Sequence, residues 1–399
     1  MNLIALRSPE FRLYFGSAVC AVNGMWILRI IIGWLSWDIS GSATFVGTVA
    51  AASLLPTVFF GPFFGVLVDR ANVIRAAFFT NIGMTACVAA LLLLQVNDLI
   101  TPLSLIAVAS ALGTVTAAHH PVRLSLGPRL VRAEYVSSVV ALAALNFNLA
   151  RLLSPALGGL LIERVGVTAA IVVTLVAFIP NLAILPRLHP REKAIKQEKE
   201  RFLQAFVLGL QYLWHRPALR LVILATAVFS IAIRGVLDIL PIIADGVFGL
   251  GAIGLGQLGS AVGAGALCAA FIKTFGRITG PASTSALSPV NTAAAVTGIL
   301  AMGLLGTTGN WGLALFAAVI MGFSGTHLGV GMQSLIQADL PDDMRGRVMS
   351  IWVVVGLGGA AAGAIGVGTF AEIVGLPAAA ITTSALGLAA IIYIFIRSR

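Results

Sequence analysis

The sequence predicts an all-α membrane protein with twelve transmembrane helices arranged as two bundles of six. The 399 residues are 59% hydrophobic and 10% charged, with a mean hydropathy of +1.01. A water-soluble fold of this size has no interior large enough for so many apolar side chains. The apolar residues also gather in stretches of about 20, the length that spans about 30 Å of hydrocarbon as a helix. A single long charged connection separates the first six stretches from the last six.

The apolar stretches follow one another along the whole chain. None shows the short alternation of apolar and polar residues that is typical of membrane barrel strands. The first contains Asn23 and Arg29 and is too long for a cleaved signal peptide, so we expect it to remain in the protein. The predicted spans are residues 11–37, 43–68, 75–96, 101–122, 138–162, 166–186, 218–244, 250–273, 283–305, 311–336, 346–370 and 375–396.

The distribution of charge predicts the orientation of the chain. The net charge is +10, and all but four of the 25 Lys and Arg residues fall on one predicted side of the membrane. Cytoplasmic loops carry such an excess of basic residues, so we expect both termini in the cytoplasm and no nucleic acid partner. The four exceptions are Arg29, Arg151 and Arg234 inside spans and Arg164 on the opposite side.

The long charged connection at 187–217 divides the chain into a predicted N-terminal bundle at 1–186 and a C-terminal bundle at 218–399. Its second part has apolar residues at helical spacing, which predicts a helix lying on the membrane surface. These residues are Phe202, Phe206, Leu210 and Leu213.

The two halves of the sequence look like repeats. "PEFRL" at 9–13 precedes the first span and "PALRL" at 217–221 precedes the seventh. A similar offset places Gly113 of the fourth span on Gly322 of the tenth. Two six-helix repeats joined by a linker are typical of secondary transporters, whose substrate site lies between the repeats.

Three motifs resemble the major facilitator superfamily. "LLPTVFFGPFFGVLVDR" (54–70) resembles its signature between helices 2 and 3, "ARLLSPALGGLLI" (150–162) is similar to the helix-5 signature of its exporters, and "DLPDDMRGRVMSIW" (339–352) resembles the loop before helix 11 in the branch of enterobactin exporters and macrolide efflux pumps. The resemblance covers nearly the whole chain and implies the major facilitator fold in a bacterial inner membrane. The matched residues are Gly65, Leu67, Asp69 and Arg70 in the first motif and Ser154, Pro155, Gly158 and Gly159 in the second.

The motifs also depart from the family pattern. The arginine in helix 4 of many proton-driven drug exporters is missing, and "HHP" at 119–121 stands near that region. Ser154 replaces the usual glycine of the helix-5 signature. Proton coupling by the scheme common in the family therefore stays open.

Asp69 and Arg70 are expected to act as a gate, together with Arg345 or Arg347. A carboxylate at the end of the second span can face an arginine or the positive N-terminus of another helix. Family geometry implies that this partner is the start of the eleventh span, so the contact would hold the cytoplasmic ends of the halves together. The alternative is that these charges only end helices and set topology.

Four charged residues lie deep in the predicted spans: Arg29, Arg151, Arg234 and Asp238. Each costs roughly 2.5–3.5 kcal/mol at the membrane centre unless it faces a cavity or a partner. Arg234 and Asp238 are four apart and can pair on one helix face, whereas the repeat offset places Arg29 opposite Asp238. Three cations with one anion predict a cavity that receives an anion. The alternative is that Arg29 or Arg151 reaches the membrane surface or bonds to backbone carbonyls.

Other polar residues in the spans complete the candidate site. We expect substrate contacts from Arg29, Arg234, Asn146, Gln257 and Gln333, with Asn148 as a further candidate. We expect proton coupling by Asp238, the one carboxylate placed deep in a span, or by His119, His120 and His327. Membrane helices also use such groups to bond one another.

The remaining residues exclude several functions. Cys20, Cys87 and Cys268 lack metal-binding spacing and are expected to be small core residues, and glycines at 356, 359, 363 and 366 predict close helix packing. No catalytic triad or phosphate-binding loop is present, so we expect neither an enzyme nor a cofactor nor a metal site.

The sequence therefore predicts a monomeric secondary active transporter that works by alternating access and contacts membrane lipids. We expect it to export a small or medium organic anion, such as a siderophore, in exchange for protons. The alternatives are an exporter of drugs, macrolides or lysolipids, and a membrane scaffold or sensor that does not transport.

Overall fold

The structure, a computed structural model, describes residues 3–191, 202–275, 288–338 and 340–397. Every regular element in this part of the chain is helical, and twelve helical segments are long and apolar enough to cross a membrane. Both the predicted fold class and the predicted number of spans are thereby confirmed.

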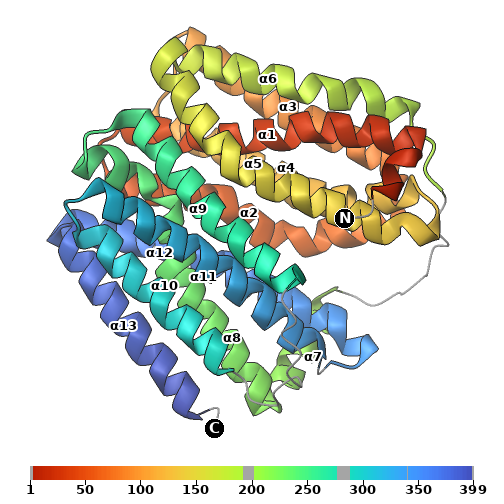
Figure 1. The fold of residues 1–399 in the computed structure, drawn as a ribbon. Coiled ribbons are helices and arrows are strands. Elements are labelled where there is room, and N and C mark those ends of the chain that lie inside the picture. The colour runs from red at the N-terminus through yellow and green to blue at the C-terminus, as the bar shows by residue number, and fades with distance from the viewer. Residues whose placement is uncertain (1–2, 192–201, 276–287, 339, 398–399) are drawn as a thin grey trace.

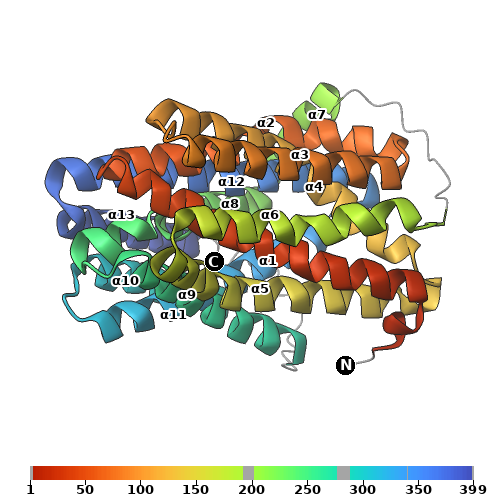
Figure 2. The same ribbon diagram turned by 90° about the horizontal axis from the view of Figure 1, so that it is seen from above.

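Six long helices form the first half: α1 (Pro9–Asp38), α2 (Ala43–Arg70), α3 (Val73–Val96), α4 (Pro102–Arg129), α5 (Val136–Val165) and α6 (Val167–Ile184). Figure 2 shows them lying alongside one another, with axes in nearly the same direction. Ser42, Asn72 and Thr101 accept hydrogen bonds from free N–H groups at the starts of α2, α3 and α4. These caps fix where each helix begins after a chain reversal.

The second half follows a short connecting helix, α7 (Phe202–Trp214). Its long helices are α8 (Pro217–Phe229), α9 (Gly251–Phe275), α10 (Pro289–Thr307), α11 (Trp311–Ala338), α12 (Asp342–Val374) and α13 (Leu376–Arg397). In Figure 1 they occupy the lower part of the molecule, below the first half.

The seventh span is not the continuous helix that the sequence predicts over 218–244. After α8 it continues as wide π-helical turns at Ser230–Arg234, a tight turn at Val236–Asp238 and a second π-helical segment at Ile242–Val247. Pro241 has no backbone N–H to donate to a preceding carbonyl, which favours an irregular backbone at this point. Wide turns of this kind occur frequently at functional sites.

The contacts between the halves are related by the internal repeat. A Cβ on Gly256 of α9 would lie 2.6 Å from the carbonyl oxygen of Pro155 in α5. Likewise, a Cβ on Gly47 of α2 would overlap the carbonyl oxygen of Ala364 in α12. Gly256 follows Gly47, and Ala364 follows Pro155, by the same 209 residues. The two interfaces are therefore copies of one another across a pseudo-two-fold axis. The same rule relates two further contacts, Gly159 with Ala252 and Gly368 with Ala43.

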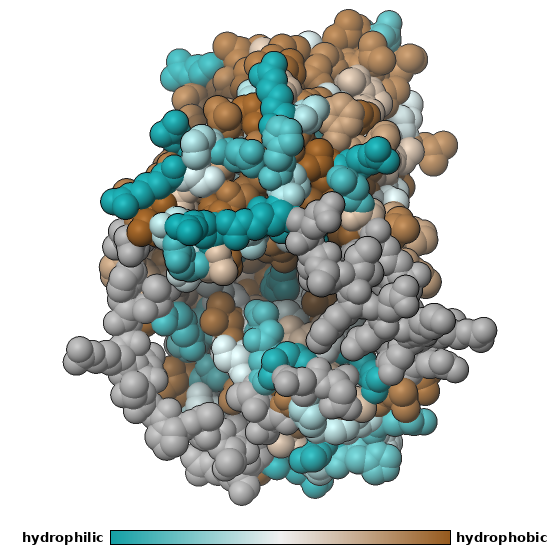
Figure 3. Space-filling model, turned by 90° about the vertical axis from the view of Figure 1, so that its right-hand side faces the viewer, coloured by the Kyte–Doolittle hydropathy of each residue, from teal (hydrophilic) through white to brown (hydrophobic). Residues whose placement is uncertain are grey.

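The halves touch at one end of the molecule and separate at the other. Ser42 and Thr44 bond to Glu372 of α12, and Trp37 of α1 bonds to Asp245; we call this end the closed end. The opposite, open end carries α7 and the first and last described residues, and there the halves spread apart in Figure 1. Figure 3, which views the open end, shows a hollow between the upper and lower parts.

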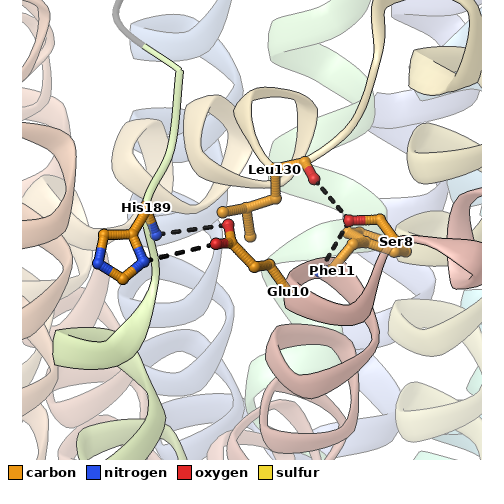
Figure 4. A network of polar contacts seen from close by, with 5 residues as sticks. All are labelled: Ser8, Glu10, Phe11, Leu130 and His189. Atoms are coloured by element: carbon orange, nitrogen blue, oxygen red, sulfur yellow. Dashed lines mark hydrogen bonds and ion pairs between the residues drawn. The ribbon is translucent and has the colours of Figure 1, made fainter.

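Hydrogen bonds tie the first half together at the open end (Figure 4). Ser8 Oγ donates to the carbonyl oxygen of Leu130 at 2.8 Å and accepts from the backbone N–H of Phe11 at 3.4 Å. Glu10 accepts from the backbone N–H of His189 at 3.4 Å and lies 3.5 Å from its Nδ1. The start of α1, the end of α4 and the segment after α6 are thus held as one unit.

Helix α7 forms within the predicted connection, but the apolar residues expected on one face of it are not all buried together. Leu213 is buried and Phe206 is partly buried, whereas Leu210 is exposed. Gly209 lies against Ile351 and Arg347 of α12, so one face of α7 packs on that helix. The expectation that α7 lies on the membrane surface stays a prediction.

The cysteines and one glycine are placed differently from the sequence prediction. Cys20 and Cys268 are exposed, and Cys87 is partly buried, so the prediction of small core residues is wrong for the first two. Gly366 has open space around it, so the close packing predicted at this position is wrong. Hydropathy marks an apolar residue but does not say which face of a helix it occupies.

Gly368 and Gly366 provide a matched test of the contact between the halves. A Cβ at Gly368 would lie 2.6 Å from the carbonyl oxygen of Ala43, whereas nothing lies within 4 Å of one at Gly366. We expect Gly368→Ala to lower Tm in detergent, since overpacking costs about 1–3 kcal/mol. Gly366→Ala should leave Tm unchanged or raise it, because Ala favours the helix. Equal Tm values for the two variants would contradict this description of the interface.

Candidate functional site

An ion pair joins the two halves in the middle of the molecule. Arg29 Nη2 of α1 donates to Asp238 Oδ1 in the broken seventh span. The residues are 209 apart, the repeat offset, so each occupies the same place in its own half. A residue that pairs with its repeat equivalent lies beside the pseudo-two-fold axis. Of the two arrangements left open by the sequence, the structure therefore shows the pair between the halves.

The two side chains of this ion pair differ in exposure. The side chain of Arg29 is 52% exposed and that of Asp238 is 9% exposed, although Arg29 lies well inside α1. Arg234 is exposed as well, and its Nη1 lies 3.6 Å from the position of a Cβ on Gly356. Arg234 interacts electrostatically with both Asp238 and Arg29, so three of the four predicted charged residues lie close together.

Two of the arginines lie over the ring of Trp26. The guanidinium carbons of Arg29 and Arg151 lie 5.6 and 6.0 Å from its ring centre, distances typical of cation–π contacts. Arg151 Nη1 also donates to Thr326 Oγ1 of α11 at 3.3 Å. That bond crosses between the halves, so Arg151 is a second polar bridge beside the Arg29–Asp238 pair.

Arg123 extends this cluster and was missed by the sequence prediction. It lies 5.3 Å above the ring of Phe147, and this ring packs edge-on against Trp26 at 5.6 Å. The predicted fourth span ends at 122, whereas α4 continues through Pro121 to Arg129. Extending the predicted span by one further helical turn would have placed Arg123 inside it. The described cluster therefore holds four arginines and one aspartate.

The helix-5 signature is a packing element of the site. Ser154 Oγ donates to Asn23 Oδ1 of α1 at 2.7 Å. Pro155 and Gly159 lie in the tight contact with α9, and Gly158 packs on Ile30. Because Ser154 reaches an α1 residue one turn before Trp26, the signature holds the aromatic centre of the cluster in place.

The other predicted substrate residues lie apart from the central cluster or make no recorded contact with it. Gln257 accepts from Trp311 Nε1 at 3.1 Å and lines a cavity of about 570 Å³ at the closed end, with Glu163 and Asp245. Asn148 donates to the carbonyl oxygen of Ala144 in its own helix at 2.8 Å. Asn146 is buried and Gln333 is partly buried.

The three histidines occupy different environments. His119 lies 3.2 Å from Thr80 Oγ1 and lines a small cavity of about 30 Å³ inside the first half. His120 is exposed. His327 is 3% exposed and stacks on Phe323, and neither of its ring nitrogens has a hydrogen-bond partner among the described residues.

The predicted gate at the open end is only partly visible. The side chains of Asp69 and Arg70 lie outside the described part of the structure. Arg345 and Arg347 both lie near the start of α12, and Arg347 Nη1 contacts Met344 Sδ at 3.6 Å. The gating role of these residues stays a prediction.

Comparisons with known proteins agree with this architecture. The sequence matches the profile of the family described as transmembrane secretion effector over residues 2–399. An enterobactin exporter of Escherichia coli O127:H6 is 25% identical over 409 residues, which cover 97% of this chain and 91% of that protein. One from Shigella boydii is 27% identical over 269 residues, which cover 66% of this chain and 62% of that protein. The chain thus aligns with less than two thirds of the second exporter.

Solved structures share the fold at low identity. A bacterial homologue of the human lysosomal transporter Spinster, inward-facing and unoccupied, has a TM-score of 0.70 and 14% identity, covering 98% of this chain and 96% of that one. The human organic anion transporter MFSD10 has a TM-score of 0.62 and 16% identity, covering 97% and 99%. With its twelve apolar helices, this is a multi-pass inner-membrane protein. The chain belongs to the transmembrane secretion effector family of major facilitator superfamily transporters.

Proposed function

We propose that this transporter exports an organic anion across the inner membrane in exchange for protons. The observation that carries the proposal is the central cluster, in which Arg29, Arg151 and Arg234 lie close together and Asp238 is the described acidic residue beside Arg29 and Arg234. Unbalanced charge at mid-membrane is costly unless a mobile partner neutralises it. A cargo with one or two acidic groups supplies that partner and enters from the open end.

The Arg29–Asp238 pair provides a mechanism for exchange. An incoming carboxylate or other oxyanion competes with Asp238 for Arg29, because both are acceptors for the same guanidinium. Once displaced, Asp238 can pair with Arg234, four residues earlier in the same span, and it stays ionised while the cargo is bound. After the cargo has left on the far side, a proton binds Asp238 and is carried back. It is expelled toward the cytoplasm when Asp238 forms its pair with Arg29 again. Because the pair joins the halves, this change of partner also alters the contact between them.

Orientation and direction follow from the charge pattern. The open end carries the basic loops, so it faces the cytoplasm with both termini on that side. The interior-negative membrane potential favours the exit of an anion by about 2.3 kcal/mol per charge per 100 mV. The named activity of the enterobactin exporters, at 25–27% identity, supports export of a siderophore-sized acid.

Two bundles, 1–186 and 218–399, act as the moving bodies of a monomer. The linker at 187–217 joins them. The Trp26–Phe147 pair at 5.6 Å would also suit a planar amphiphilic drug, and the first experiment below separates that cargo from an anion.

Replacing Arg29 tests the charge of the cargo. We expect Arg29→Gln to weaken binding of an acidic ligand by roughly 1.5–3 kcal/mol, the value of a hydrogen bond to a charged group, and to affect neutral amphiphiles far less. Binding is measured by calorimetry on purified protein with acidic and neutral aromatic ligands. Arg164→Gln, outside the cluster, is the control and should bind like wild type. Equal losses for acidic and neutral ligands would mean that Arg29 holds structure and not cargo.

Replacing Asp238 tests the exchange mechanism. Arg29 is 52% exposed, so Asp238→Asn should leave a folded protein despite the lost ion pair. With its competitor gone, Arg29 should bind an acidic ligand more tightly, by about tenfold, or roughly 1.4 kcal/mol. Transport into proteoliposomes should no longer respond to an imposed pH gradient.

The contrary outcome is equally clear. Retained stimulation by the gradient in Asp238→Asn would exclude this aspartate as the coupling group. His119, His120 and His327 would then be replaced in turn.

A further inference from the structure

A single carboxylate bonds the two halves at the closed end. Glu372 Oε2, near the end of α12, accepts from Ser42 Oγ at 2.7 Å and from the backbone N–H of Thr44 at 2.8 Å. Ser42 and Thr44 begin α2 in the other half. Glu372 is exposed, so the water outside the closed end reaches it directly.

This contact depends on the ionised form of Glu372. The first N–H groups of a helix have no partner within the helix, and the helix dipole adds partial positive charge there. Ser42 already accepts from the N–H of Phe45 at 3.2 Å, and Glu372 supplies the acceptor for Thr44. An ionised carboxylate accepts both bonds with the favourable charge, whereas a protonated one loses that charge. Protonation therefore weakens the contact that keeps the halves together.

The internal repeat offers a comparison residue. Glu163 precedes Glu372 by the repeat offset of 209, and Gly251 follows Ser42 by the same offset. Glu163 Oε2 lies 3.2 Å from the position of a Cβ on Gly251, at the start of α9. The backbone N–H of Gly251, however, donates to Asp245 Oδ1 at 3.2 Å. Glu163 is therefore a carboxylate at the position equivalent to Glu372, but it does not accept the hydrogen bond from the helix N-terminus that Glu372 accepts.

We propose that Glu372 is a proton-binding site that controls opening of the closed end. Ionised Glu372 holds the start of α2 against α12, and protonated Glu372 releases it. The groups recorded against its carboxylate are Ser42 and Thr44, and neither titrates near neutral pH. Because binding and conformation are linked, a proton that favours the open form is itself bound more tightly in that form. This inference concerns the gate and does not depend on the identity of the cargo.

The consequence for transport follows from the position of the carboxylate. Protons on the side of the closed end reach Glu372 without passing through the protein. Acidification of that side then shifts the population toward the form that opens there. A proton gradient thus acts on the gate as well as on the central site.

Distance measurements between spin labels test this proposal without any cargo. Labels replace Asn97, at the end of α3, and Gly309, between α10 and α11, in a variant whose three cysteines are changed to serine. Asn97 is exposed and a side chain at Gly309 meets open space. In wild type, the fraction with a long distance should rise as pH falls from about 6 to about 3, the range in which a glutamate carboxylate takes up its proton. Glu372→Gln should show the raised fraction at every pH, with an open-to-closed ratio about twofold to thirtyfold higher at pH 8, as expected for loss of a helix cap.

Two further variants serve as controls. Glu163→Gln removes an equivalent carboxylate that caps no recorded N–H, so it should keep the pH response of wild type. Ser42→Ala removes one of the two bonds to Glu372 and should shift the ratio in the same direction, by less. Combined with Glu372→Gln it should add little. A wild-type pH response in Glu372→Gln, or an equal loss of that response in Glu163→Gln, would overturn the proposal.

Discussion

The ion pair between Arg29 and Asp238 is the interaction on which the rest of the structure depends. It unites two repeat-equivalent positions beside the pseudo-two-fold axis, so Arg29 takes its counter-ion from the opposite half. Removing two charges from water is costly, and their attraction offsets that cost only with good geometry. The break in the seventh span provides this geometry, because the tight turn at Val236–Asp238 brings the carboxylate to Arg29.

Close backbone approach is the second constraint, and it explains why glycine is placed where the halves meet. Gly47, Gly159, Gly256 and Gly368 each face a carbonyl oxygen of the opposite half. Without a hydrophobic driving force inside the bilayer, helices associate through such close packing and through hydrogen bonds. Contacts of this kind have no side chains to rearrange, so they can separate and form again as rigid surfaces. The repeat makes the contact of α5 with α9 equivalent to the contact of α12 with α2, and this symmetry suits a rocking motion of the halves about the axis.

Sequence reasoning reached the fold and the charged centre for physical reasons. A span is apolar over most of its length, so hydropathy alone predicts the twelve spans. A charged residue inside a span is easily recognised for the same reason. What the sequence does not contain is the direction in which a side chain points. Gln257 was predicted to bind cargo from its type alone, yet it bonds to Trp311 at the closed end. Arg123 was missed because the predicted fourth span ended at 122, one residue before it, whereas the helix continues to Arg129. Glu372 was missed because its partner, the start of α2, is 328 residues away from it.

The centre and the closed end are connected through the same pair of segments. Trp37 Nε1 donates to Asp245 Oδ2 at 2.9 Å, and these residues are 208 apart, nearly the offset of the central pair. Trp37 stands two turns after Arg29 in α1, about 12 Å along a helix, and Asp245 follows Asp238 in the seventh span. Displacing Asp238 from Arg29 therefore loosens one of two bonds that hold the same segments together. Because α1 is one continuous helix from Arg29 to Trp37, a change at the central pair can reach the closed end through it.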